Sequence, residues 1–178
     1  MTRNDKKQGG VGFLIHKKLK DNITEFHATS DRVASVAIKI SKRYDIKIIQ
    51  AYAPTSLSSQ DALDEFYDDL RNALQRKKAH FNIIKGDFNA KVGNGDEDCV
   101  GPFGYGTRNE RGDDLVNFAT TNNFKITNTF YKKKQNRRWT WRSPDFETFN
   151  EIDYVLVDKS NIVKNTEVLN RVGIDSDH

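Results

Sequence analysis

Two polar side chains follow directly on a short apolar stretch near the middle of the chain. Residues 81–84 are rich in Ile and Phe, Gly86 comes next, and Asp87 and Asn89 follow at a spacing of two. Because side chains alternate along extended backbone, Asp87 and Asn89 should point to the same side. A carboxylate and an amide at the end of a buried strand could hold a water molecule or a phosphate oxygen. Asp-x-Asn is also common turn chemistry, so a purely structural pair is the alternative.

Apolar periodicity predicts the elements that would position this pair. Alternation predicts strands over 33–40 and 46–52 that form an antiparallel hairpin, and the run at 81–84 predicts a buried strand. A serine cap at Ser58-Ser59 precedes apolar residues at helical spacing, which predicts an amphipathic helix whose last turn holds residues 76–78.

The remaining elements are predicted in the same way. The glycine-opened segment 9–15 and the segments 125–130 and 151–157 are predicted strands. The glycine-rich stretch 92–112 is predicted to be a long surface loop, and 113–123 a second amphipathic helix. Strands interspersed with helices indicate a mixed, layered α and β domain, which we expect to span residues 1–178 as one unit.

Composition limits the possible functions. The chain has 178 residues, a net charge of +4 and a pI near 9.1, which permits a polyanionic partner. No apolar run approaches the ~20 residues of a membrane span, so no membrane partner is expected. The single cysteine, Cys99, excludes an internal disulfide and a cysteine-rich zinc site, and it fits a reducing, intracellular compartment.

The stretch 131–142 is strongly basic and aromatic. It holds six Lys or Arg residues, no acidic residue and three aromatic rings. Cations could meet phosphates and a tryptophan could stack on a base. The alternative is a solvated hairpin tip followed by a core strand in which Trp139 or Trp141 is buried. The candidate nucleic-acid-binding residues are Lys132, Lys133, Lys134, Arg137, Arg138 and Trp139.

Seven short motifs, in order along the chain, resemble the endonuclease/exonuclease/phosphatase superfamily, the group of deoxyribonuclease I and the abasic-site endonucleases. They are Gly-Gly-Val-Gly-Phe-Leu-Ile from Gly9, Ala51-Tyr52-Ala53-Pro54, Gly86-Asp87-Phe88-Asn89-Ala90, Asn109-x-Arg111-Gly112, Thr140-Trp141-x-x-Pro144, Ile152-Asp153-Tyr154-Val155-Leu156 and Ser176-Asp177-His178. Each motif is weak alone, but their shared order is specific. Among the branches, the chain is most similar to endonuclease domains of non-LTR retrotransposons and to craniofacial development protein 2-like proteins.

This resemblance implies a fold and a set of roles. The implied fold is α+β, a four-layer α/β/β/α sandwich of the deoxyribonuclease I type. His178 matches the histidine that acts as general base or stabilises the phosphorane, and Asp153 matches the aspartate that orients it. Asp87 matches the carboxylate that positions or deprotonates the attacking water.

The resemblance also implies contacts to phosphate and metal. Asn89 matches an amide that holds a phosphate oxygen, and Tyr52 matches a side chain at the scissile phosphate. Asp177 matches a carboxylate near the metal, which together with Asp87 would bind Mg²⁺ or Mn²⁺. The implied partner is DNA, and the implied compartment is the nucleus.

The sequence also departs from the superfamily pattern. The pattern places an Asn on a first strand and a metal-binding Glu after a first helix, both upstream of Gly9, and continues with one more core strand after His178. We therefore expect a fold that lacks the first strand and helix and the last strand, and a nuclease domain that is weakly active or inactive as this fragment.

Three functions remain open at the level of sequence. The first is a metal-dependent endonuclease that hydrolyses the phosphodiester bonds of DNA, and the second is a phosphatase of the same superfamily. The inositol phosphatase branch is disfavoured because Asn150-Glu151-Ile152-Asp153 replaces its motif. The third is a non-catalytic nucleic-acid-binding or interaction module.

Overall fold

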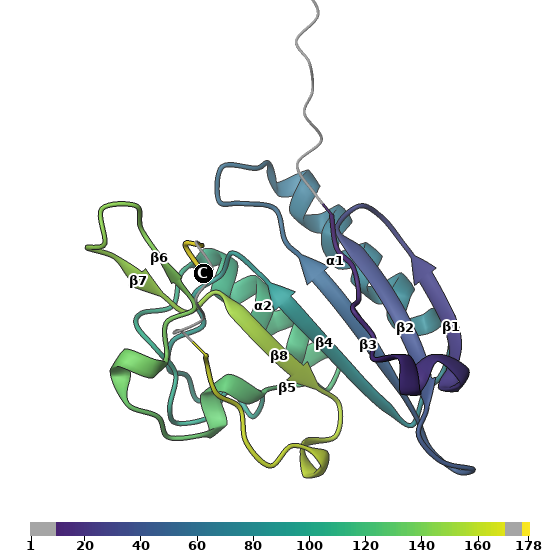
Figure 1. Ribbon diagram of the computed structural model, residues 1–178. Coiled ribbons are helices and arrows are strands. Elements are labelled where there is room, and N and C mark those ends of the chain that lie inside the picture. Colours follow the sequence, from purple (N-terminus) through teal and green to yellow (C-terminus); the bar gives the residue numbers. More distant parts are fainter. Residues whose placement is uncertain (1–9, 170–175) are drawn as a thin grey trace, which may run out of the picture.

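The computed structural model describes residues 10–169 and 176–178 of the chain. Six strands form one sheet in the order β1-β2-β3-β4-β8-β5, and two short strands form a separate hairpin, β6-β7 (Figure 1). The strands are β1 (Ile23–Ala28), β2 (Val33–Lys39), β3 (Asp45–Tyr52), β4 (Phe81–Asp87), β5 (Lys125–Ile126), β6 (Trp141–Arg142), β7 (Phe149–Asn150) and β8 (Asp153–Val157). The helices are α1 (Gln60–Arg76) and α2 (Glu110–Thr121), with short 3-10 turns at Lys17–Asn22, Thr127–Phe130, Gln135–Arg137 and Ser160–Ile162.

Both helices cover the same face of the large sheet (Figure 1). Strands β1, β2 and β3 are antiparallel neighbours, as are β4 and β8, and β8 and β5. Strands β3 and β4 are parallel, and α1 is the crossover that joins them. The carboxyl ends of β3 and β4 therefore lie at the same end of the sheet, next to the amino end of the antiparallel strand β8.

Helix α1 forms as the sequence predicts. The Ser59 hydroxyl accepts a hydrogen bond from the backbone N–H of Ala62 at 3.3 Å and so caps the first turn. The apolar side chains of α1 and α2 bury themselves against those of the central strands, in a cluster that includes Phe66, Leu70 and Leu115. This burial provides most of the stabilisation of the two helices, because amphipathic helices of this length are marginal alone.

A buried lysine fixes the far end of α1. Lys47 of β3 is only 2% exposed, and its ammonium donates to the backbone carbonyls of Ala73 at 3.0 Å and Leu74 at 2.6 Å. These carbonyls lie in the last turn of the helix, where unpaired acceptors and the helix dipole favour a cation. Burial lowers the pKa of Lys47, but the two carbonyls give its N–H groups partners.

Three predictions about local structure need correction. Residues 10–15 are not a strand: Leu14 is fully exposed, and the edge of the sheet is formed instead by β1. The predicted strand at 125–130 ends at Ile126, because the Thr129 hydroxyl donates to the Ile126 carbonyl at 2.7 Å and a 3-10 turn begins there.

The glycine-rich loop is also less superficial than predicted. It has no helix or strand from Phe88 to Arg108, yet Val92, Cys99 and Val100 are buried in the main core cluster. The loop therefore closes one side of the core as well as connecting β4 to α2.

The α+β class is confirmed. Within the described part of the chain there is one six-stranded sheet and one two-stranded hairpin, rather than the two large packed sheets of the four-layer prediction. No helix among the residues described is both long and apolar enough to cross a membrane.

Candidate active site

Three polar side chains occupy one row across the centre of the sheet. Tyr52 is the register partner of Asp87 between β3 and β4, and Asp87 is the partner of Asp153 between β4 and β8. Directly opposed residues on neighbouring strands point to the same face, so the row presents a phenol and two carboxylates side by side. The row lies at the end of the sheet where the central strands β3 and β4 finish, next to the C-terminus (Figure 1).

A glycine lets β4 reach this row. Gly86 has φ of +146°, and a Cβ built on it would lie 1.8 Å from the carbonyl oxygen of Ala51. Only glycine combines that backbone conformation with such close packing of β3 on β4. Gly86 therefore sets the position from which the Asp87 side chain leaves the sheet.

The turn after β4 fixes Asp87 and Asn89 against each other. The backbone N–H of Asn89 donates to Oδ1 of Asp87 at 2.8 Å, and the Asn89 side chain donates from Nδ2 to the carbonyl of Ala53 at 3.0 Å. Asn89 has φ of +48°, a left-handed conformation that asparagine tolerates better than most residues. The turn interpretation of this pair is therefore confirmed, and the turn holds Asp87 in place.

His178 lies between the two carboxylates. Its Nδ1 is 2.9 Å from Oδ2 of Asp153, and its Nε2 is 3.9 Å from Oδ2 of Asp87. The hydrogen bond with Asp153 raises the pKa of His178, and the negative charges of Asp87 and Asp177 act in the same direction. An imidazole held in this way by a carboxylate on one nitrogen has its other nitrogen directed at a reacting group in acid–base enzymes.

The surroundings of Asp87 raise the pKa of its carboxyl group. Burial raises the pKa of Asp87 to about 6, and the charges of Asp153 and Asp177 add to the rise, whereas the bond from Asn89 and the charge of His178 oppose it. A carboxyl with a pKa near neutrality can exchange protons at working pH. This shift in the pKa of Asp87 could not be predicted from the sequence, because the shift depends on burial.

A buried polar network supports Asp153 from behind. The Thr140 hydroxyl accepts the backbone N–H of Asp153 at 3.0 Å, and Asn128 donates from Nδ2 to the carbonyl of Asp153 at 3.0 Å. Asn128 also donates to Oε1 of Glu151 at 3.1 Å, and Glu151 lies 3.5 Å from the guanidinium of Arg138. Glu151 and Arg138 are 3% and 4% exposed, so this is a buried ion pair two residues from Asp153.

The basic stretch therefore divides into two groups. Lys132, Lys134 and Arg137 are exposed, as a nucleic-acid contact requires. Arg138 was predicted with them but points inward, where it donates to the carbonyl of Asn128 at 3.2 Å and pairs with Glu151. This could not be predicted from the sequence, because the partner, Glu151, lies 13 residues away and no local pattern links the two residues.

The other two members of the predicted set have partners in the structure. The ammonium of Lys133 donates to Oδ1 of Asn165 at 2.7 Å and lies 3.3 Å from Glu167. The ring of Trp139 is half-buried and packs on Phe149 with the ring centroids 5.0 Å apart.

A cavity of about 530 Å³ opens in front of the row. Its lining includes five predicted site residues from three separate segments, Tyr52, Asp87, Asn89, Asp177 and His178. Its other lining residues are Thr55, Ser56, Lys91, Asn109, Trp141, Asn150 and Ile152.

Trp141 and Asn109 are cavity residues to which the sequence analysis assigned no role. The indole N–H of Trp141 donates to Oδ2 of Asp177 at 3.0 Å, and the backbone N–H of Arg142 donates to the carbonyl of Asp177 at 2.9 Å, so β6 holds residue 177 beside the cavity. Asn109 accepts the backbone N–H groups of Lys91 at 2.9 Å and Gly112 at 3.0 Å, which ties the loop to the start of α2. Both residues lie in motifs that resemble the superfamily pattern, and these motifs are the sequence signal that could have identified them.

The carboxylates of the site are candidate ligands for a magnesium-type ion. Across residues 10–169 and 176–178 there is no group of three or more His, Cys, Asp or Glu side chains arranged to hold a metal. Mg²⁺, however, is commonly held by one or two carboxylates and completes its shell with waters and substrate phosphates. Asp87 and Asp177 could supply these two, since each affects the charge state of the site and Asp153 is already engaged by His178.

Comparison with known proteins agrees with this architecture. A family model described as Endonuclease-reverse transcriptase matches residues 46–178. Craniofacial development protein 2 from Bos taurus is 34% identical over 152 residues, which are 84% of this chain and 26% of that protein. The same protein from Tragulus javanicus is 32% identical over 152 residues, with the same coverage. The chain thus spans about a quarter of the length of these curated relatives.

A solved structure shares the fold. It is the 3′ phosphatase NExo from Neisseria bound to a product DNA hairpin, with a TM-score of 0.51 and 13% identity, covering 78% of this chain and 59% of that one. The superfamily of these proteins is hydrolytic and includes nucleases and phosphatases. The match of the family model over most of the sequence shows that this chain belongs to the endonuclease-reverse transcriptase family of the endonuclease/exonuclease/phosphatase superfamily.

Proposed function

We propose that this domain is an endonuclease that hydrolyses phosphodiester bonds of DNA with the help of Mg²⁺ or Mn²⁺. The observation that carries the proposal is the placement of His178, bonded to Asp153 at 2.9 Å and 3.9 Å from Asp87, on the wall of a cavity of about 530 Å³.

Each residue of the row has a chemical task in this proposal. Asp153 holds the imidazole of His178 in one orientation and stabilises its protonated form. Asp87, which lines the cavity, accepts a proton from the attacking water. Tyr52 and the second N–H of the Asn89 amide, whose first N–H is used by Ala53, are donors for the phosphate oxygens.

A divalent ion held by Asp87 and Asp177 would offset the negative charge that develops on the phosphate in the transition state. The exposed cations Lys132, Lys134 and Arg137 would bind the DNA backbone, and the loss of affinity with added salt would report how many phosphates they neutralise. The relatives are longer proteins, so for this chain any activity or partner of theirs is only proposed.

The test is Mg²⁺-dependent nicking of supercoiled plasmid by the whole chain. His178→Ala and Asp87→Ala should each reduce the nicking rate by at least about 100-fold, the usual contribution of a positioned acid or base. His16→Ala is the matched control, because His16 is exposed and only caps a 3-10 turn. Nicking that persists in both site variants, or that does not require the metal, would overturn the assignment.

The same assay separates the remaining alternatives. Release of phosphate from a 3′-phosphorylated oligonucleotide without nicking would indicate a phosphatase. Salt-dependent binding of duplex DNA without hydrolysis of either substrate would indicate a binding module.

A further inference from the structure

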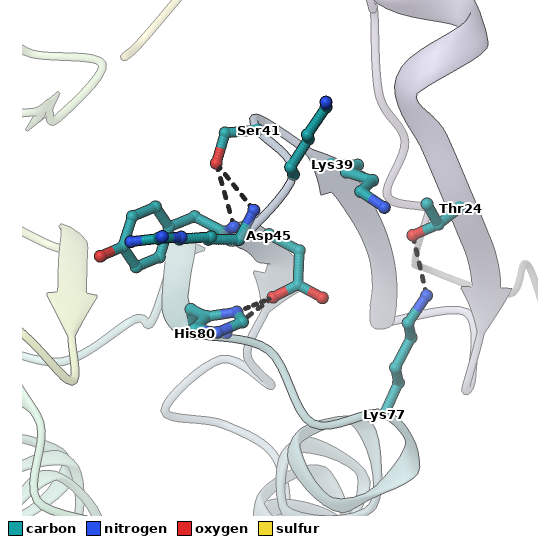
Figure 2. A pocket seen from close by; sticks show the side chains of 9 residues that line it. Thr24, Lys39, Ser41, Asp45, Lys77 and His80 are labelled. Carbon is teal, nitrogen blue, oxygen red and sulfur yellow. Dashed lines mark hydrogen bonds and ion pairs between the residues drawn. The ribbon is translucent and has the colours of Figure 1, made fainter.

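A second cavity lies at the opposite end of the sheet from the acidic row. It measures about 250 Å³ and is formed where β1, β2 and β3 meet the end of α1 and the start of β4 (Figure 2). Asp45, in its wall, is the first residue of β3, whereas Tyr52 is the last. At 3.3 Å per residue the two cavities are separated by about 23 Å, so a ligand bound at one does not fill the other.

The wall of this cavity is strongly cationic. Lys39, Lys42, Arg43 and Lys77 line it, and Asp45 is the only carboxylate among its lining residues. No salt bridge is found for any of these four cations in the described part of the chain. In Figure 2, Lys77 reaches from the end of α1 to the Thr24 hydroxyl, to which it donates at 2.8 Å.

The one carboxylate is already engaged. Oδ1 of Asp45 accepts the backbone N–H of His80 at 2.8 Å and lies 2.7 Å from the Nδ1 atom of the same residue (Figure 2). The nearest acid on β1, Glu25, accepts from Arg76 at 2.8 Å. Within residues 10–169 and 176–178 the four cations therefore have no ion-pair partner, although like charges gathered around one cavity repel one another.

The turn that carries two of these cations is ordered by its own hydrogen bonds. The Ser41 hydroxyl accepts the backbone N–H groups of Arg43 at 3.2 Å and Tyr44 at 3.1 Å, and the backbone N–H of Ile40 donates to the carbonyl of Tyr44 at 3.0 Å. A fixed turn lowers the entropic cost of bringing Lys42 and Arg43 to a ligand.

We propose that this cavity binds a phosphate-bearing ligand. Lysine and arginine side chains are the usual partners of phosphate oxygens, and the volume corresponds to about eight water molecules at ~30 Å³ each, enough for a phosphate or pyrophosphate group. The ring of Tyr44, which also lines the cavity and is 48% exposed, packs edge-on against His80 with the centroids 5.3 Å apart. An exposed ring beside cations provides a surface on which a base can stack, so the phosphate could belong to a free nucleotide or to a nucleic-acid strand.

The test is a titration followed by amide NMR signals of the whole chain, carried out in EDTA so that no hydrolysis intervenes. Inorganic pyrophosphate should shift the amide signals of residues 41–45 and 77–80. The double variant Lys42→Ala/Arg43→Ala should weaken binding about tenfold, as expected for the loss of two exposed charge contacts. The matched control is Lys17→Ala/Lys18→Ala, which removes two exposed cations outside the cavity and should change affinity less than twofold.

A parallel titration with a short single-stranded oligonucleotide distinguishes the two sources of phosphate. Tighter binding of the oligonucleotide, with shifts at the same amides, assigns the cavity to a nucleic-acid strand, whereas binding of pyrophosphate and ADP alone assigns it to a free nucleotide. If millimolar pyrophosphate leaves residues 41–45 unshifted, or if both double variants weaken binding equally, the proposal is wrong. Because His178→Ala should bind pyrophosphate here unchanged, failure of this proposal and failure of the nuclease assignment remain separate results.

Discussion

At the two ends of the central strands, the surroundings shift the pKa of an aspartate in opposite directions. Asp87, where β4 ends, is largely buried among other carboxylates, and burial raises its pKa to about 6. Asp45, where the neighbouring strand β3 begins, receives hydrogen bonds from His80, and the side-chain bond is the main reason that its pKa is lowered. One sheet thus carries an acidic end that tends to hold a proton and a basic end whose single acid stays ionised.

The contrast shows where the chain accepts a cost in stability. The acidic end gathers like charges, a left-handed asparagine and a buried ion pair. Each of these features costs free energy of folding. The basic end places the four cations of its cavity on side chains without ion pairs among the described residues, where their repulsion costs little, and its one buried cation, Lys47, donates to two backbone carbonyls. The costs at the acidic end agree with the function proposed for it.

The largest effect expected at the acidic end comes from Gly86→Ala. The new methyl group would meet the Ala51 carbonyl at 1.8 Å, and the backbone would have to keep φ of +146°, so β3 and β4 must separate. We expect a loss of more than about 4 kcal/mol in the free energy of unfolding, measured by urea denaturation. Gly106→Ala is the control, since φ there is +69° but no atom lies within 4 Å of the added Cβ, and it should cost only about 1–2 kcal/mol. Equal losses would show that packing of β3 on β4 is not the constraint.

The buried pair behind Asp153 should give the next largest effect. Arg138→Met leaves Glu151 ionisable in the interior, where burial already raises its pKa, and should cost about 3–5 kcal/mol. Adding Glu151→Gln should recover part of that loss, because no unpaired charge then remains. Arg71→Ala, which breaks the exposed pair with Asp68, should cost less than about 1 kcal/mol. Strictly additive losses for the two buried substitutions would argue against a coupled pair.

Asp87→Asn should produce a pH-dependent gain in stability. The folded-state pKa of Asp87, about 6, lies above its usual value of 3.8, so the proton contributes stability below pH 3.8 that is lost as the pH rises through 6. The asparagine, which carries no charge beside Asp153 and Asp177, should match the wild type near pH 4 and exceed it by about 1–2 kcal/mol near pH 8. The pKa of His178 should be lower in the variant, because the Asp87 charge that helps to raise it is removed. Urea denaturation in EDTA measures the difference, and a difference that does not vary with pH would contradict the raised pKa.

Asp45→Asn should have the smallest effect, with the opposite pH dependence. The folded-state pKa of Asp45 is lowered, so its charge contributes stability above the unfolded-state value that is lost as the pH falls. Because the pair with His80 is partly exposed, the variant should lose at most about 1 kcal/mol near pH 6 and match the wild type near pH 2. A loss that persists at the low pH would mean that the carboxyl acts through hydrogen bonding alone.

Periodicity was enough to predict the elements that have a strong local signal. The α1 helix, its serine cap, the β2–β3 hairpin and the strand before Gly86 all form, because apolar spacing and capping are local properties. Residues 10–15 have a strand-like composition but no pairing partner among the described residues, and pairing decides whether a strand forms. The motif order also placed Asp87, Asp153 and His178 in one site, and the structure brings these residues together.

Long-range burial could not be derived from the sequence. Arg138 directly follows the exposed Arg137 in the sequence, and only the fold turns Arg138 inward toward Glu151. The raised pKa of Asp87 likewise depends on side chains contributed by β8 and by the last described residues. The cationic cavity could not be predicted because its lining comes from three separate stretches, at Thr24, 39–45 and 77–80, which only the fold brings together.

The register row has a consequence for the order of events during synthesis. Tyr52, Asp87 and Asp153 become neighbours only when β8 inserts next to β4, and β8 is separated from β4 by the long loop and α2. Such distant pairings form late and slowly, because the chain between them must be ordered first. A nascent chain that still lacks β8 can already have formed α1 and the β1–β4 part of the sheet, with Tyr52 beside Asp87 but without Asp153. The candidate site is therefore completed last, and under the proposed function hydrolysis would begin only in a chain that has finished folding.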